Sequence, residues 1–170
     1  MITCPSCGAE NPGGFRFCGS CGAALVEAAP AREVRKTVTV LFCDVVGSTA
    51  LGERVDPEPV RRLMGSYYEQ MRSIVERHGG TVEKFVGDAV MAVFGIPRSH
   101  EDDALRAVRA SAEMQAAAVL LELGVRIGIN TGEVVTGEGE TLVTGDAVNV
   151  AARLEQAAAH GETLIGSEKL

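Results

Sequence analysis

The sequence predicts an α+β domain preceded by a small cysteine-rich module, and three observations lead to this prediction. Four of the five cysteines fall within the first 21 residues of the chain. After them, apolar segments typical of strands alternate with segments that have the 3.6-residue period of helices. The length of 170 residues suits one domain of ordinary size with a small addition.

Composition and charge exclude several classes of protein. Hydrophobic residues make up 46% of the chain and aromatic residues 4%, so we expect a folded core built from Val, Leu, Ala and Ile. The formal net charge of -7 would repel a phosphate backbone, which argues against nucleic acid as a partner. The first residues do not have the pattern of a signal peptide, so none is expected, and no apolar run approaches the roughly 20 residues that span a bilayer. We therefore expect a cytoplasmic protein without a membrane partner, whose cysteines bind metal rather than form disulfides.

The N-terminal module contains two Cys-x-x-Cys pairs with ten residues between them. This spacing suits tetrahedral coordination of one structural zinc ion per chain, and it predicts a zinc ribbon over residues 1–25. A redox pair is the alternative, but such motifs usually occur singly. So few residues fold only if metal binding supplies the free energy. The predicted ligands are Cys4, Cys7, Cys18 and Cys21.

The role of the ribbon is limited by its charge. Arg16 is its only basic residue up to Pro30, so a protein contact or a structural cap is expected rather than nucleic-acid binding. Residues 26–34 include an Ala-rich stretch with Pro30 and no periodicity, which predicts a linker. The main domain is therefore expected over residues 35–170.

The main domain has strand and helix patterns in alternation. Thr37 to Val46 is almost wholly apolar and β-branched, as in a strand buried on both faces. A helix follows from Asp56, with Pro57 in its first turn, and Gly79 stops it. We expect the remaining elements in this order: strands 81–85 and 89–94, a helix over 101–123, strands 125–131 and 133–137, a helix over 146–159, and a strand over 163–165. The order βαββαβ, with additions after it, predicts a ferredoxin-like sheet with helices on one face.

Two acidic residues lie where strands of this sheet end. Asp44 closes the first strand, where an unpaired carboxylate would cost several kcal/mol, and Asp88 lies in the turn of the hairpin. Small residues, Gly47, Ser48 and Thr49, come soon after Asp44, as in loops whose amides bind phosphate. Either carboxylate alone would more often cap a turn.

Three segments together resemble the class III adenylyl and guanylyl cyclases: Phe42–Thr49, Glu83–Asp88 and Gly145–Leu154. The resemblance runs from about Lys36 to the end of the chain. It implies that Asp44 and Asp88 hold two Mg²⁺ or Mn²⁺ ions per active site, with the Val45 carbonyl as a further ligand. It also implies that triphosphate is bound by the amides of Val46, Gly47, Ser48 and Thr49.

The same resemblance assigns the other side of the site. Asn149 and Arg153 lie four residues apart on a predicted helix, where they would orient the ribose and stabilise charge on the α-phosphoryl group. Lys84 resembles the lysine that reads adenine, which favours ATP, although an exposed lysine on an edge strand is the alternative. The family forms each site across a dimer, so a homodimer is expected.

The chain departs from the family at two points. Leu142 stands where an Asp or Thr usually accepts a hydrogen bond from adenine, and Thr144 lies two residues on as a substitute. The family normally continues beyond the end of this sequence. We therefore expect that the chain is part of a longer protein, whose C-terminal region is a candidate for binding a partner protein.

Two functions follow from these residues. The first is an adenylate cyclase of intracellular signalling, which converts ATP to 3',5'-cyclic AMP and pyrophosphate. The second is a weak or inactive cyclase-like domain that binds nucleotide or regulates by dimerisation. A diguanylate cyclase is set aside because the chain lacks its Gly-Gly-Asp/Glu-Glu-Phe turn.

Overall fold

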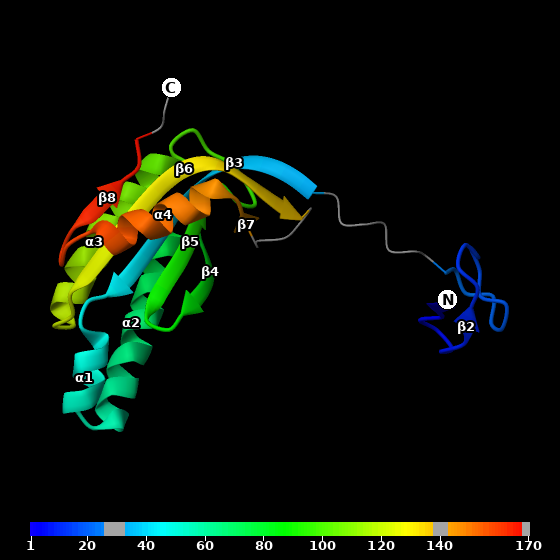
Figure 1. Cartoon of the computed structure of the whole chain (residues 1–170), viewed down its shortest axis with the longest axis horizontal. Coiled ribbons are helices and arrows are strands. Elements are labelled where there is room, and N and C mark those ends of the chain that lie inside the picture. The colour runs from blue at the N-terminus through cyan, green and yellow to red at the C-terminus, as the bar shows by residue number, and fades with distance from the viewer. Residues whose placement is uncertain (26–32, 138–142, 168–170) are drawn as a thin grey trace. The chain divides into compact units, whose positions relative to one another are not determined.

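The computed structural model describes residues 1–25, 33–137 and 143–167 (Figure 1). They belong to two compact units, Met1–Glu33 and Val34–Leu170. Most of the expected linker over residues 26–34 lies outside the described residues, and its last two residues open a strand, β3.

The N-terminal unit is a pair of turns attached to a very small sheet. Strand β1 (Ile2–Thr3) pairs antiparallel with β2 (Glu10–Asn11). Each Cys-x-x-Cys forms the same turn, in which the amide of Gly8 or Gly22 donates to the carbonyl of the first cysteine at 2.9 Å. Both glycines have positive φ, near 74°, which a residue with a side chain rarely adopts. The buried cluster consists of Cys4, Cys18 and Leu25, so sulfur forms much of the interior.

The larger unit is built on one mixed sheet. Among the described residues its strands lie in the order β4-β5-β3-β6-β7, with β8 parallel to β6. The central pairing of β3 with β5 is antiparallel and places Cys43 opposite Val90. The elements are β3 (Glu33–Val45), α1 (Ser48–Arg54), α2 (Pro57–Arg77), β4 (Thr81–Val86), β5 (Ala89–Phe94), α3 (Asp103–Leu120), β6 (Val125–Gly137), β7 (Val143–Thr144), α4 (Asp146–Ala157) and β8 (Thr163–Ile165).

Helices cover both faces of this sheet. Alternate residues of β3 point to opposite sides, so Leu41 packs in the cluster that contains α2 and α3, whereas Val40 packs in the cluster that contains α4. The expectation that all helices share one face is therefore wrong for α4, which Figure 1 shows on the side of the sheet away from α2 and α3. Sequence periodicity shows which stripe of a helix is buried but not which face of the sheet receives it.

Helix α4 lies unusually close to β6 because two glycines face it. A Cβ on Gly128 would collide with the backbone of α4 at Ala151 and Glu155, and a Cβ on Gly132 would lie 2.9 Å from the Cβ of Ala147. The two glycines are four residues apart and so lie on the same face of the strand. They fix the distance between the sheet and the helix.

Most elements match the expected order and type. Strand β5 has the expected bounds, and α2 begins at Pro57 and buries Tyr67, Met71 and Ile74. The two strands expected over 125–131 and 133–137 are one continuous strand, β6. No helix in the described part of the chain combines the length and apolarity that a bilayer-crossing segment needs.

Candidate active site

Two carboxylates come together where β3 ends and the β4–β5 hairpin turns. Asp44 is the second-last residue of β3, and Asp88 lies in the turn between β4 and β5. Because β5 pairs with β3, the hairpin turn lies beside the end of β3. Gly87, with φ of 62°, allows the tight turn, and its carbonyl accepts a hydrogen bond from the hydroxyl of Tyr68 on α2. The sheet and a helix together therefore fix the position of Asp88.

The charge balance at this pair favours a cation. Burial raises the pKa of Asp44, and the carboxylate of Asp88 raises it further through its charge and a shared hydrogen bond, whereas Arg126 acts in the opposite direction. Two adjacent carboxylates are unfavourable without positive charge between them. Their oxygens are the hard donors that Mg²⁺ and Mn²⁺ prefer, so these residues fit the expected metal ions.

The segment after Asp44 turns sharply into a short helix. Gly47 has φ of 77°, and α1 begins at Ser48. The amide of Val46, which the sequence assigned to phosphate, instead donates to the carbonyl of Gly124 at 2.8 Å. The prediction that the amides of Gly47, Ser48 and Thr49 bind phosphate is not affected by this contact. The side chain of Thr49 is not among those that the structure describes.

Lys84 lies on β4 with its side chain half exposed and contacts a buried acid. Its Nζ is 3.7 Å from Oε1 of Glu83, whose side chain is only 3% exposed. Neighbouring residues normally point to opposite faces of a strand, but a bulge interrupts the register between Val82 and Lys84. Both carboxylate oxygens of Glu83 are buried without a hydrogen-bond partner, and burial raises its pKa. Glu83 is an acidic neighbour of Lys84 that the sequence analysis did not single out.

Helix α4 presents Asn149 and Arg153 to solvent. They lie one turn apart on the same face. Within the described residues neither side chain forms a hydrogen bond or ion pair, and neither is joined to Asp44 or Asp88. Thr144 on β7 is also exposed, and Leu142 lies outside the described residues. Asp44 and Asp88 are thus brought together within one chain, whereas Asn149 and Arg153 have no side-chain partner among its described residues.

Arg126 on β6 connects the carboxylates to α4. Its Nη2 donates to Oδ2 of Asp44 at 3.1 Å, and its Nε lies 2.6 Å from Oε1 of Glu155 on α4. The second contact is an ion pair without good hydrogen-bond alignment. The sequence analysis missed Arg126, although a single arginine within the apolar run Val125–Ile129 was a visible signal.

The four ribbon cysteines form a second candidate site. Their sulfur atoms all lie within 4.8 Å of one another. The Cys4–Cys21 and Cys7–Cys18 pairs are 3.6 and 3.7 Å apart, close to the roughly 3.8 Å expected around a tetrahedral zinc with bonds of about 2.3 Å. Backbone amides, followed by the side chain of Asn11, lower the pKa of Cys18, whereas hydrogen bonds with the other thiols and burial raise the pKa of Cys7. The cluster therefore favours some thiolates and opposes ionisation of all four without a cation.

Comparison with known proteins decides the family. The family model described as "Adenylate and Guanylate cyclase catalytic domain" matches residues 31–169. The chain belongs to this cyclase family. A second model, a domain of unknown function, matches residues 2–26.

Solved cyclases share the fold of the larger unit. The adenylyl cyclase CyaB from P. aeruginosa matches with a TM-score of 0.76 and 35% identity, over 81% of this chain and 80% of that chain. The guanylyl cyclase Cya2 matches with a TM-score of 0.71 and 36% identity, over 78% of this chain and 75% of that chain. Cyclases for both bases are therefore similar to this domain.

Curated relatives are much longer than this cyclase chain. An adenylate cyclase from Anabaena cylindrica is 34% identical over 137 residues, which are 71% of this chain and 27% of the relative. The chain spans about a quarter of the length of the curated relatives it matches first.

Proposed function

We propose that the cyclase domain converts ATP to 3',5'-cyclic AMP and pyrophosphate, using two divalent ions at a homodimer interface. The observation that supports this most directly is the pairing of Asp44 with Asp88 at the end of β3, where Asp88 raises the pKa of Asp44. A structural pair of like charges would destabilise the fold, whereas a cation site needs it.

The metal half of the site comes from β3 and the hairpin. Asp44 and Asp88 would hold both ions, with the carbonyl of Val45 as a further ligand. When bound, such ions activate the attacking ribose 3'-hydroxyl and stabilise the leaving pyrophosphate. Gly47 directly precedes α1 and Ser48 is its first residue. Their amides follow Asp44 closely in the chain and would bind phosphate oxygens.

The base half of the site would use Lys84. Its exposed ammonium can donate to N1 of adenine, whereas the N1–H of guanine would oppose it. The hydroxyl of Thr144 would accept a hydrogen bond from the amino group of adenine, as a substitute for the Asp or Thr that the family usually has where this chain has Leu142. In these roles the two residues would favour ATP over GTP.

Asn149 and Arg153 would complete the site from a second copy of the chain. They are exposed on α4 and have no partner in their own subunit among the described residues. In a two-fold dimer each subunit would give its carboxylates to one site and its α4 residues to the other. Arg153 would stabilise charge that develops on the transferred phosphoryl group.

A chain-mixing assay tests shared sites. Asp44→Asn and Arg153→Ala should each lower cyclic product formation by at least about 100-fold, because each removes stabilisation made in the transition state. Mixed in equal amounts and allowed to exchange, they form heterodimers with one intact site and should regain up to about a quarter of wild-type activity.

The matched control is Arg61→Ala, which removes another exposed helical arginine. Mixing it in equal amounts with Asp44→Asn should give about half of wild-type activity, because every working site needs the intact carboxylates of an Arg61→Ala subunit. No recovery in the Asp44→Asn and Arg153→Ala mixture would contradict shared sites. If wild-type protein makes no product from ATP or GTP with Mn²⁺ or Mg²⁺, the second function, a regulatory cyclase-like domain, replaces the first.

We also propose that residues 1–25 form a ribbon around one zinc ion, ahead of a linker over 26–34 and a cyclase domain over 35–170. The spacing of the four sulfur atoms supports a metal ion between them. Fewer than about 0.5 zinc per purified chain would contradict the metal site.

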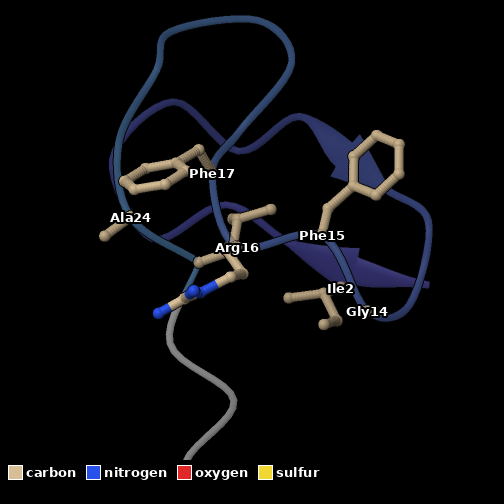
Figure 2. A pocket seen from close by; sticks show the side chains of 7 residues that line it. Ile2, Gly14, Phe15, Arg16, Phe17 and Ala24 are labelled. Carbon is tan, nitrogen blue, oxygen red and sulfur yellow. The ribbon is translucent and has the colours of Figure 1, made fainter.

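Two aromatic residues of the ribbon are open to a partner protein. Figure 2 shows Phe15 and Phe17 projecting on either side of Arg16, and both residues are more than half exposed. These are the side chains that a partner protein would contact.

A further inference from the structure

Arg126 occupies a position between two acids that belong to different parts of the fold. Asp44 ends β3, and Glu155 lies in the last turns of α4. The guanidinium reaches both, at 3.1 Å and 2.6 Å, and its Nη1 also approaches the carbonyl of Gln156 at 3.5 Å. Its planar fork can serve two carboxylates at once, which a lysine ammonium does less well.

The ion pairs of Arg126 with Asp44 and with Glu155 are both partly buried. The side chains of Arg126, Asp44 and Glu155 are 31%, 20% and 8% exposed. Salt screens such partly buried charges much less than surface pairs. Gly128 on the same strand brings the backbone of α4 against β6, so Glu155 has little freedom to move away from Arg126.

We propose that Arg126 is a positioning residue that orients the metal-binding carboxylate of Asp44 and ties it, through Glu155, to the helix that carries Asn149 and Arg153. The inference rests on the proposed function, since it concerns the same carboxylate. Within one subunit, Asp44 serves one active site and α4 serves the other. Arg126 therefore connects the metal-binding carboxylate of one active site to the helix that contributes Asn149 and Arg153 to the other active site of the dimer.

The charge of Arg126 is divided between its two acids, and this division predicts effects of opposite sign. Glu155→Gln removes one negative charge, so the guanidinium competes more strongly with a divalent ion at Asp44. Arg126→Gln removes the competing positive charge and leaves Glu155 negative nearby, so a divalent ion is held more tightly. A purely structural role would weaken metal binding in both variants or in neither.

The test is titration of the full chain with Mn²⁺ alone, after removal of other free divalent ions but with the ribbon zinc retained, and electron paramagnetic resonance measures the free Mn²⁺. Relative to wild type, the Mn²⁺ dissociation constant should rise about threefold to tenfold in Glu155→Gln and fall by a similar factor in Arg126→Gln. The double variant should return near the wild-type value. At saturating Mn²⁺, kcat should fall about tenfold in Arg126→Gln and in the double variant, because Asp44 loses its fixed orientation, whereas Glu155→Gln, which keeps the contact between Arg126 and Asp44, should change kcat much less; KM for ATP should change less than twofold in all three.

Two controls separate this inference from the proposed function. Arg62→Ala breaks an exposed ion pair with Glu58 on α2 and should leave Mn²⁺ binding and kcat unchanged. Asp44→Asn should abolish Mn²⁺ binding at the site. Equal binding by wild type and Asp44→Asn would overturn the proposed metal site and the inference with it. Loss of binding in Asp44→Asn, combined with shifts of the same sign or none in Glu155→Gln and Arg126→Gln, would overturn the role of Arg126 alone.

Discussion

The two units of this chain are stabilised by different physical means. In the ribbon, the buried apolar cluster is limited to Cys4, Cys18 and Leu25, and the four sulfurs converge on one point. In the cyclase unit, two apolar layers fill the faces of the sheet, and no described cysteine there has a sulfur partner. The difference teaches that residues 1–25 have too small a core to rely on burial and that the proposed zinc ion would replace it, whereas a domain of ordinary size relies on burial.

The largest effect should come from removing the ribbon metal. Chelation, or Cys18→Ser, should unfold residues 1–25 completely, because zinc contributes about 10–16 kcal/mol to comparable small modules. The thermal unfolding of the cyclase unit should not change. Amide NMR signals of residues 1–25 report the first effect and calorimetry the second. Dispersed ribbon signals without any metal would break the comparison.

Shortening a core side chain should destabilise the cyclase unit and leave the ribbon unchanged. Phe94 on β5 is fully buried and lies against Gly80, so Phe94→Ala should cost the cyclase unit about 3–5 kcal/mol in urea unfolding. The zinc content of the ribbon should stay the same. Val86→Ala on the neighbouring strand is the control, because Val86 is 56% exposed and should cost little. Equal losses at both positions would contradict the two-layer core.

A smaller effect should come from adding one methyl group between β6 and α4. Gly128→Ala places a Cβ against the backbone of α4 and should destabilise the domain by about 1–3 kcal/mol. Cyclase activity should fall by more than the loss of folded protein accounts for, because Asn149 and Arg153 move with the helix.

Gly65→Ala is the matched control for that change. Gly65 lies inside α2 with open space around it, so alanine should stabilise the domain by about 0.5–1 kcal/mol. Urea unfolding and the cyclic nucleotide assay measure both variants. A neutral Gly128→Ala would show that the helix can move away from the sheet without cost.

The smallest effect concerns an ion pair between α2 and α3. His78 and Arg77 lie 2.7 and 2.6 Å from the carboxylate of Glu113, and the hydrogen bond from His78, with help from Arg77, lowers the pKa of Glu113 below its ordinary value of 4.5. A lowered folded-state pKa stabilises the fold above the unfolded-state pKa, and this stabilisation is lost as pH falls. Glu113→Gln should therefore reduce the melting temperature slightly at neutral pH, and the difference should shrink as pH falls below 4.5 and vanish once pH lies below the lowered pKa of Glu113. A difference that persists in acid would point to packing instead of charge.

Local signals allowed much of the fold to be predicted from the sequence. Strand β5 and the start of α2 follow from an apolar run and from Pro57, which act within a few residues. The strand end and the hairpin turn that the sequence predicts indicated where Asp44 and Asp88 would lie. The family resemblance of three segments is confirmed by the match over residues 31–169.

The missed features depend on contacts between distant residues. Arg126 and Asp44 are 82 positions apart, so no local pattern indicates that they form a pair. The face of the sheet that α4 covers depends on Gly128 and Gly132, which look like strand breakers in the sequence but in fact allow a helix to approach. The metal ligands, the base-reading residues and the zinc remain proposals with direct tests.

The burial of Cys43 divides the thiols of this protein into two chemical classes. Cys43 precedes Asp44 on β3, its sulfur lies 3.5 Å from the hydroxyl of Tyr67, and burial raises its pKa to about 12. Alkylating reagents attack thiolates, so they should spare Cys43 in the native domain at neutral pH. The reagent would then modify only the N-terminal sulfurs, and its rate would report whether they are occupied by metal.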